Sequence, residues 1–433
     1  MTVFELTART IDPVSVAAGP ASHNDHVALD HIPGTVLRGA IAAQWIRDNG
    51  APTSGTRKVF EELFERFVEF GRLMPVGFEV VPMHVWRCKY RSLSSCADTV
   101  HDALHEPDGP PPACDKCGGP LEPGKGELIG PGGSALPLLR RTRTELDAHG
   151  QVVKGNLFTR AAIRPGTALA GQVRVRDGLG PAQLDWLKGL DERTVWVGGK
   201  LTVGGRVLLA LSEQDAAPPL PTRRDDGKVA LRLAAPGIFV DKFARPALTP
   251  AGFDLPSGSS IGGRWARPVT VAGWHAVVRL PKPTDIAVAA GSAYLLDGVQ
   301  GACQADLGAL ASSAIGLRQV EGFGAIEVNP PPWTPPVPVP TALSTPAAPA
   351  GVQPLAATLR DSLADRDRRW IIGELKALAA AKTTGDAGSD LLAQRRIRRF
   401  SPTSIEALGQ AVALPADDVE ALARALDQRG AAR

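Results

Sequence analysis

The sequence Ile315-Gly-Leu-Arg-Gln-Val-Glu-Gly-Phe-Gly-Ala-Ile-Glu-Val328 decides how the second half of this chain is interpreted. Three glycines surround one arginine, and the segment continues into apolar residues that are typical of a strand. Glycine permits positive φ and a close approach of the backbone to a ligand. N–H groups in such a turn suit anions, and an arginine adds a planar charged fork for phosphate oxygens. The candidates for contact with a polyanion are Gly316, Arg318, Gly322, Phe323 and Gly324.

A related stretch closes the first half of the chain: Val195-Trp-Val-Gly-Gly-Lys-Leu-Thr-Val-Gly-Gly-Arg-Val-Leu-Leu-Ala-Leu211. Its glycine pairs lie between two strand-like runs, so we expect a second turn of the same kind. Two such turns predict two related domains that each present backbone to a polyanion. The alternative for both turns is a plain hairpin or a packing contact between domains. The candidates here are Gly198, Gly199, Lys200, Gly204, Gly205 and Arg206.

Length and charge bound the function classes. At 433 residues the chain is too long for one core and predicts two or three domains. The net charge of +3 does not by itself predict nucleic-acid binding. Local clusters matter more for steering a polyanion, and a solvated face is the alternative for each of them. Arginines gather at 140–143, 174–176, 264–267 and 395–399.

The sequence predicts neither a targeting signal nor a membrane span. Its N-terminus lacks a basic start followed by an apolar core, so no signal peptide is predicted. No apolar run approaches the ~20 residues that a membrane span needs. We therefore expect a cytoplasmic protein without a membrane partner.

Apolar periodicity predicts strands mixed with helices. Pro33 and Gly34 form a turn before a helix, with Thr35 as its N-cap. A short amphipathic helix is expected at 61–70. Strands are expected at 3–11, 77–85, 161–175, 194–211, 229–233, 269–280 and 286–296, and further helices at 307–315, 355–378, 404–414 and 416–428.

These elements predict an α+β fold with two ferredoxin-like, or RRM-like, domains. The second domain is joined to a helical module by a proline-rich, semi-rigid tether. The expected bounds are 1–212 for the first domain with a Cys-rich insertion at 86–133, 213–227 for a linker, 228–330 for the second domain, 331–354 for the tether and 355–433 for the module.

Four of the five cysteines form a candidate metal site, and they are Cys88, Cys96, Cys114 and Cys117. The knuckle Cys114-Asp-Lys-Cys117 is followed by two glycines, so two thiolates can converge on one ion. Four thiolates around zinc make a closed site that is structural rather than catalytic. The sequence therefore predicts a structural zinc that staples the insertion.

Other readings of these cysteines stay open. A pair of disulfides is disfavoured in a reducing cytoplasm, and a redox Cys-x-x-Cys motif would not need the other two cysteines. A histidine could replace one thiolate, and His84, His101 and His105 lie nearby. Cys303 stands alone and is expected to be a small buried apolar side chain.

Three segments together resemble the RAMP superfamily of CRISPR effector proteins. Ile32-Pro-Gly-Thr-Val-Leu-Arg-Gly39 looks like the superfamily's Pro-Gly motif at the start of its first helix, and Gly322-Phe-Gly324 looks like its glycine loop. The cysteine insertion and the run Gly155-Asn-Leu-Phe-Thr-Arg-Ala-Ala-Ile-Arg-Pro-Gly-Thr167 are most similar to the Cas5-like large RAMP subunit of type III-D systems. The resemblance covers residues 1–330 and leaves out the C-terminal helices.

The resemblance implies a non-catalytic subunit of an RNA-guided effector complex. Such subunits bind the 5′ tag of the CRISPR RNA and anchor the large polymerase/cyclase-type subunit and the first backbone RAMP subunit. A single strand can be held through phosphates and read through unstacked bases. The motifs add Gly34 and Arg38 to the RNA-proximal candidates. Target RNA is a further candidate partner, through the arginines at 395–399.

Alternatives remain for single residues and for the whole chain. Arg38 could be a helix-face arginine paired with a local acid, and Phe323 is as good a core residue as a stacking platform. The chain could be a Cas7-like backbone subunit that cleaves target RNA with Asp25 or Asp30 and a divalent ion. It could be a CRISPR RNA-processing nuclease with His26 or His31 as general base. It could also be a protein–protein adaptor that binds no RNA.

Overall fold

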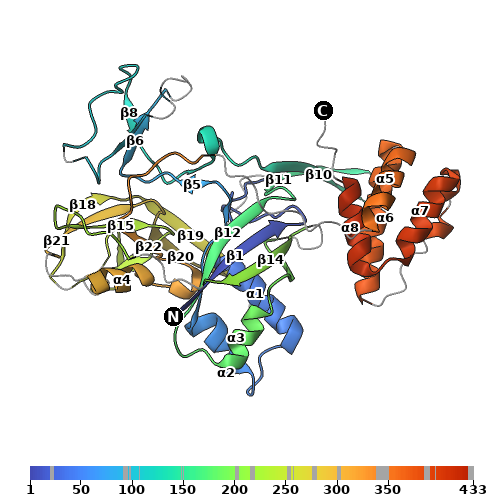
Figure 1. The fold of residues 1–433 in the computed structure, drawn as a ribbon, viewed down its shortest axis with the longest axis horizontal. Coiled ribbons are helices and arrows are strands. Elements are labelled where there is room, and N and C mark those ends of the chain that lie inside the picture. Colours follow the sequence, from blue (N-terminus) through green and yellow to red (C-terminus); the bar gives the residue numbers. More distant parts are fainter. Residues whose placement is uncertain are drawn as a thin grey trace. The chain divides into compact units, whose positions relative to one another are not determined.

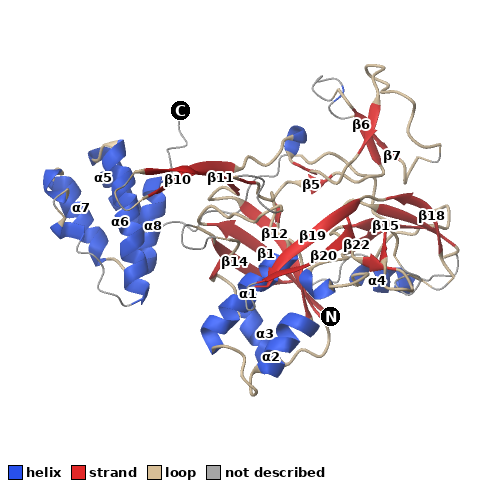
Figure 2. Cartoon of the chain, turned by 180° about the vertical axis from the view of Figure 1, so that it is seen from behind, coloured by secondary structure: helices blue, strands red, loops and turns tan. Residues whose placement is uncertain are grey.

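The computed structural model describes the chain in two compact units, residues 1–340 and 341–433. The residues that it does not describe are 20–23, 91–95, 97–98, 107, 148, 150, 200–203, 215–219, 251–254, 257, 276–279, 300–303, 338–350, 385–390, 395 and 428–433. Strands dominate the first unit and helices form the second (Figure 2). The chain is therefore α+β, as the sequence predicts.

The first sheet lies in the N-terminal half and is antiparallel along its order β13-β14-β1-β12-β3. Counting β1, β3, β12 and β14 in chain order, the spatial order is fourth, first, third, second. Helices α1 and α3 lie against one face of this sheet (Figure 1). The elements are β1 (Thr2–Thr10), α1 (Gly34–Asn49), β3 (Val68–Phe70), β12 (Ala168–Val175), α3 (Pro181–Lys188), β13 (Thr194–Trp196) and β14 (Arg206–Glu213), with β4 (Met74–Pro75) also paired to β12.

The second sheet repeats this order in the other half of the first unit. Its antiparallel strands run β18-β21-β15-β22, which again places the first strand between the third and the fourth. A helix lies between the third and fourth strands in the sequence, as α3 does in the first half. The elements are β15 (Val229–Leu233), β18 (Ser260–Trp265), β21 (Ala293–Asp297), α4 (Gln304–Ser312) and β22 (Ile326–Val328), with a small pair β16 (Phe239–Val240) and β17 (Pro246–Ala247).

A two-stranded ribbon immediately precedes the third strand of each sheet. In the first half it is β10 (Leu139–Leu146) with β11 (Val152–Ala162), and β2 (Asp25–His26) pairs with β11 in parallel. In the second half it is β19 (Pro268–His275) with β20 (Leu280–Val288). Both ribbons carry exposed apolar side chains, including Leu157 and Trp274.

The cysteine insertion forms a small sheet of its own in the order β7-β6-β8. These strands are β6 (Val85–Cys88), β7 (Val100–Asp102) and β8 (Leu121–Pro123). A second small pair, β5 (Glu79–Val80) and β9 (Leu128–Ile129), closes the base of the insertion.

Periodic burial explains why these segments pack as they do. Phe4, Leu6 and Ala8 alternate along β1 and are buried, which is the period-two pattern of a half-buried strand. Leu37 and Ile41 repeat at helical spacing on α1 and are buried in the same core. The second sheet has a separate core.

The second unit consists of helices around its own apolar core. Leu359, Leu375, Leu408 and Leu422 are buried in it. Ser401 is the N-cap of α7, since its hydroxyl accepts from the Ser404 N–H at 3.2 Å. The elements are α5 (Val352–Ser362), α6 (Asp365–Thr384), α7 (Pro402–Ala413) and α8 (Ala416–Asp427), with short 3-10 turns at Leu391–Ala393 and Ile397–Arg399. No described helix is both long enough and apolar enough to cross a membrane.

One predicted cap is wrong, and two predicted helices are only partly confirmed. Residues 61–70 are the end of α2 (Arg57–Glu61), a π-turn at Glu62–Arg66 and then β3, because the edge of β12 recruits Val68–Phe70 into the sheet. The expected helix at 355–378 is broken at Leu363, whose ψ of 134° is extended. Pro33, not Thr35, is the N-cap of α1, so this helix starts on a glycine without a side-chain cap.

Several predicted strands also cover two separate elements. These are 77–85 (β5 and the start of β6), 161–175 (the end of β11 and β12), 194–211 (β13 and most of β14) and 269–280 (β19 and the start of β20). Residues 286–296 likewise cover the end of β20 and the start of β21. Gly291, with φ of 82°, makes the turn between them. The strand predicted at 229–233 coincides with β15.

Candidate functional site

The Pro-Gly motif and the second glycine turn meet in space. A Cβ placed on Gly34 would lie 2.0 Å from the Phe70 carbonyl oxygen, 2.6 Å from the Glu321 carbonyl oxygen and 3.0 Å from the Gly322 Cα. Only glycine fits at such distances from backbone atoms. The start of α1 therefore packs directly on the turn that follows α4, more than 280 residues later in the sequence.

Backbone contacts within the protein account for all three glycines of that turn. Gly316, Gly322 and Gly324 have φ near +80°, and a Cβ on any of them would meet a carbonyl oxygen at 2.5 Å or less. The N–H of Gly322 donates to Gln319 O and that of Gly324 to Pro236 O, both at 2.8 Å. These two amides therefore have acceptors already and would lose them on binding a phosphate.

Arg318 is held by acids on both sides. Its Nη1 donates to Asp285 Oδ2 at 2.5 Å, and its Nε and Nη2 donate to the Glu321 carboxylate at 3.1 and 2.8 Å. The guanidinium lies 5.0 Å from the centre of the Phe323 ring, which is itself buried. Burial opposes the charge on Glu321, but bonds from Arg318 and Lys282 outweigh it and lower the pKa of Glu321 to about 2. The turn is thus clamped to the β19–β20 ribbon by an ion-pair network.

The two other candidate arginines are also paired. Arg38 donates from Nε to the Phe64 carbonyl oxygen at 2.6 Å and forms an ion pair with Glu65. Arg206 donates from Nε to Asp12 Oδ2 at 2.7 Å. Each of these guanidinium groups already has an anionic partner within the chain. RNA contact by these residues stays a prediction.

The first glycine turn packs on the segment after β1. A Cβ on Gly198 would lie 2.5 Å from Ser15 O, and one on Gly204 would lie 2.6 Å from Pro13 O. The N–H groups of Gly199 and Gly205 donate to the same two carbonyls, each at 3.1 Å. Gly199 is exposed, with only Arg160 Nη1 at the 4 Å limit. Lys200 lies outside the described residues.

Comparison with known proteins yields structural similarity only. No protein-family model matches the chain, and neither does any curated protein. Among solved structures, the chain is similar to one from the type III-B Cmr-beta complex bound to cognate target RNA and AMPPnP. That match has a TM-score of 0.41 and 11% identity over 67% of this chain and 86% of the other.

Two smaller proteins match parts of the chain. Cmr4 from Pyrococcus furiosus has a TM-score of 0.25 and 11% identity over 49% of this chain and 99% of its own. A Cas6 protein in complex with a substrate mimic has a TM-score of 0.25 and 15% identity over 38% of this chain and 81% of its own.

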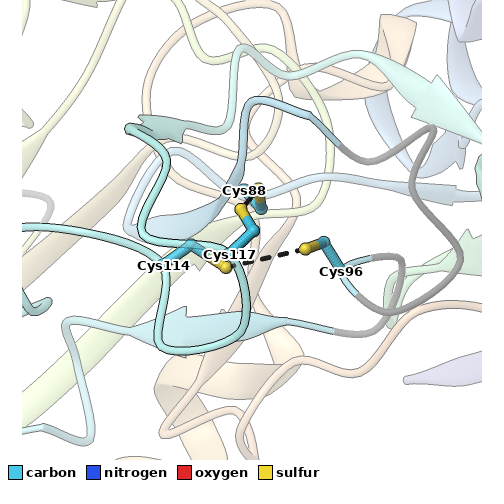
Figure 3. A group of neighbouring side chains, drawn as sticks. All are labelled: Cys88, Cys96, Cys114 and Cys117. Atoms are coloured by element: carbon cyan, nitrogen blue, oxygen red, sulfur yellow. Dashed lines mark hydrogen bonds between the residues drawn. The ribbon is translucent and has the colours of Figure 1, made fainter.

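The four predicted cysteines lie together in the insertion, where they could hold one metal ion (Figure 3). All four sulfurs lie within 4.8 Å of one another. Cys88 and Cys117 are 3.6 Å apart and Cys96 and Cys114 are 3.9 Å apart, which is well beyond a disulfide bond. Cys88 ends β6, while Gly118 with φ of 66° closes the knuckle that carries Cys114 and Cys117. Cys303 lies outside the described residues.

Electrostatics in this cluster favour a thiolate at Cys114. Burial disfavours the charged form, but N–H donors of Lys116 and Cys117 outweigh it, so the pKa of Cys114 is lowered. Burial raises the pKa of Cys88. A cation among the sulfurs would favour the charged form of both.

The neighbouring histidines serve another contact. His84 Nδ1 lies 2.8 Å from Asp102 Oδ1, and His105 Nδ1 lies 3.2 Å from Asp102 Oδ2. The backbone N–H of Trp333 donates to the same Oδ2 at 3.1 Å. The first residues of the proline-rich segment are thereby fixed to the insertion, and Trp333 is buried. No local pattern predicts this contact, because the prolines around Trp333 favour an extended tether.

The acids considered for catalysis have partners of their own. Asp25 forms an ion pair with Arg140 at 2.8 Å, and Asp30 lies 2.8 Å from His31 Nδ1. Within the described residues, neither aspartate belongs to a group of side chains that could share a metal ion. His26 lies on β2, beside β11.

Proposed function

We propose that this chain is a RAMP-superfamily subunit of a type III CRISPR effector complex. The observation that carries the proposal is the contact between the Pro-Gly start of α1 and the glycine turn at Gly322, because these are the two segments that resemble superfamily motifs. The repeated strand order supports it. β1, α1, β3, β12, α3 and β14 follow the β-α-β-β-α-β sequence of a ferredoxin-like domain, and the second sheet has the same strand order with a helix only before its last strand.

Within such a complex, the Cas5-like role of type III-D systems fits the features of the chain. The subunit would bind the 5′ tag of the CRISPR RNA and anchor the large polymerase/cyclase-type subunit and the first backbone RAMP subunit. Arg141 and Arg143 on the β10–β11 ribbon are exposed and offer positive charge to a phosphate chain. Gly199 is exposed beside this ribbon, with Arg160 Nη1 4.0 Å from its Cβ position, although its N–H already donates to Ser15 O.

A structural zinc ion would staple the insertion. Tetrahedral zinc with Zn–S bonds of about 2.3 Å places its sulfurs about 3.8 Å apart. The sulfur separations of 3.6 and 3.9 Å in this chain match that spacing. Cys88, Cys96, Cys114 and Cys117 would be the four ligands, and a site closed by four thiolates leaves no position for substrate.

The proposed role is non-catalytic. Asp25 and Asp30 are paired with Arg140 and His31, so a divalent ion at either carboxylate would have to compete with that partner. The competing role as a Cas7-like subunit that cleaves target RNA requires Asp25 or Asp30 at the scissile phosphate. The role as a processing nuclease requires His26 or His31 there as general base.

Two measurements test the proposal. The full chain, co-expressed with its CRISPR array and purified at low salt, should retain RNA whose 5′ end is the repeat-derived tag. RNA that is absent, or of random sequence, would contradict tag binding. A reconstituted complex that contains the Asp25→Asn or the Asp30→Asn variant should cleave target RNA at the wild-type rate. A loss of cleavage in either variant would show that the chain is a nuclease subunit instead.

A further inference from the structure

A cavity of about 400 Å³ lies between the two sheets of the first unit. On the side of the first sheet its walls include Arg72 and Arg174, and on the side of the second sheet they include Arg232 and Glu327. Val173 and Val175 of β12 face the helix-covered core, so Arg174 between them points to the opposite face of the strand. Gly322 and Phe323 also line the cavity, which places it beside the glycine turn.

The walls of this cavity hold hydrogen-bond donors without acceptors. The Nη1 atoms of Arg174 and Arg232 are buried and have no hydrogen-bond partner among the described residues. Trp333 also lines the cavity, and its indole Nε1 has no hydrogen-bond partner among the described residues. This nitrogen lies close enough to the Glu79 carboxyl to affect its pKa. Buried donors normally find partners, and an unsatisfied one is costly. A molecule rich in acceptor oxygens would satisfy these groups.

Three arginines and three glutamates line the cavity, but these charges are not all paired with one another. Among the described residues, neither Arg72 nor Arg174 has a carboxylate within ion-pair distance, and Arg174 makes only a 3.4 Å contact with the Gln172 side chain. Two of the three acids on the walls have arginine partners: Glu69 accepts from Arg176 Nε at 2.7 Å, and Glu327 accepts from Arg232 Nε, on the same wall, at 2.7 Å. Glu79 is exposed. Burial lowers the pKa of Arg72 to about 10, which leaves it cationic at neutral pH.

We propose that this cavity binds one nucleoside monophosphate unit, with its phosphate oxygens accepting from Arg72 and Arg174. Planar guanidinium groups match phosphate oxygens in pairs. Phe78 and Trp333 line the same space and offer aromatic surface to a base. The volume falls in the range of small-ligand pockets. Two sources of this nucleotide share the same chemistry. It is either one unit of a bound RNA strand, which rests on the proposed function, or a free nucleotide.

The test compares the full chain with two variants and a matched control. Arg72→Gln and Arg174→Gln each remove one cavity cation, while Arg264→Gln removes an exposed arginine of β18. The ligands are AMP and a short single-stranded RNA, titrated by calorimetry at low salt. We expect each cavity variant to bind about tenfold more weakly than wild type or more, and the control to bind as wild type. The ligand-free Arg174→Gln protein should unfold at the wild-type temperature, because Arg174 has no ion pair to lose.

The outcomes separate the cavity from the proposed function. Weaker binding of RNA and AMP in both cavity variants supports the cavity with an RNA nucleotide in it. Binding of AMP alone, lost in the variants, supports the cavity with a free nucleotide and counts against the RNA role. Wild-type affinity in both variants overturns the cavity proposal while RNA binding stands. Binding of neither ligand by the wild type overturns both.

Discussion

Gly34 and Gly322 lie back to back, so close that a side chain on Gly34 would come 3.0 Å from the Gly322 Cα. Their neighbour is the Phe70 carbonyl oxygen at the end of β3, which a Cβ on either glycine would meet at 2.3 Å or less. The contact joins the first helix of one half to the turn before the last strand of the other. Two glycine motifs that look like ligand loops in the sequence therefore also fasten the two halves together.

The Gly34–Gly322 contact predicts opposite effects for two glycines of α1. Gly34→Ala should lower the free energy of unfolding by about 1–3 kcal/mol, because the backbone at Phe70 has to shift. Gly39 lies on the same helix, is exposed and has nothing within 4 Å of its Cβ position. Gly39→Ala should therefore raise stability by about 0.5–1 kcal/mol through helix propensity. Thermal unfolding of both variants measures this, and equal shifts of one sign would contradict the packing role of Gly34.

The sequence was sufficient for much of the fold and for the grouping of the cysteines. Alternation located β1 and β15, and the Cys-x-x-Cys knuckle identified the cluster, because these signals are local. It was insufficient where distant segments decide the structure. Val68–Phe70 become a strand only because β12 offers an edge, and Arg318 finds Asp285, 33 residues away, on a ribbon whose pairing no local pattern predicts.

Metal content will separate the thiolates from the nearby histidines. Cys114→Ser should abolish binding of the proposed zinc ion and lower the unfolding temperature, because an ion held by four thiolates contributes folding free energy directly. His101→Gln should keep the metal stoichiometry of wild type, since the described metal-binding group contains the cysteines alone. Elemental analysis of the purified proteins gives the answer. Loss of metal from the His101→Gln variant would instead show that this imidazole, and not one of the four thiolates, is a metal ligand.

The network around Arg318 predicts a structural cost for a substitution that keeps the charge. Lysine carries one ammonium and cannot reach both Asp285 and Glu321 as the guanidinium does. Arg318→Lys should lower the stability of the chain by about 1 kcal/mol or more. Arg264→Lys, at an exposed position, should change it little. Urea unfolding measures both. Unchanged stability combined with weaker RNA binding would instead show that Arg318 is a phosphate contact.

Three arginines that the sequence makes candidates for RNA contact illustrate why function is harder to predict than fold. Arg38, Arg206 and Arg318 lie beside glycine turns, which favours a phosphate contact, yet each has a carboxylate partner. Asp12 is 194 residues from Arg206, so the pairing has no local signature. Arg72 and Arg174 carry no motif. The pairing of β12 with β3 places Arg174 near Arg72, and the second sheet supplies the opposite wall of the cavity.

The buried node at His84 predicts that stability falls as the pH drops below about 6.5, the ordinary value for histidine. Burial lowers the pKa of His84, opposed by its bond to Asp102, with Arg232 and His105 further disfavouring the cation. The unfolded chain then binds more protons than the folded one, so stability is present above the unfolded pKa and is lost below it. The loss should be on the order of 1 kcal/mol per pH unit.

His84→Gln isolates this contribution, since glutamine can donate to Asp102 but does not titrate. The buried Nε2 of His84 gives the ring a second reason to stay neutral. No described group accepts a hydrogen bond from this nitrogen, so a proton placed on it would lack an acceptor. We expect the unfolding temperature of the wild type to fall more steeply between pH 7 and pH 5.5 than that of the variant. The backbone N–H of Trp333 is bonded to Asp102. Tryptophan fluorescence should therefore report release of the segment that carries Trp333 over the same pH range. Parallel pH profiles for the two proteins would mean that His84 stays protonated in the folded state and that Asp102 holds it as a cation.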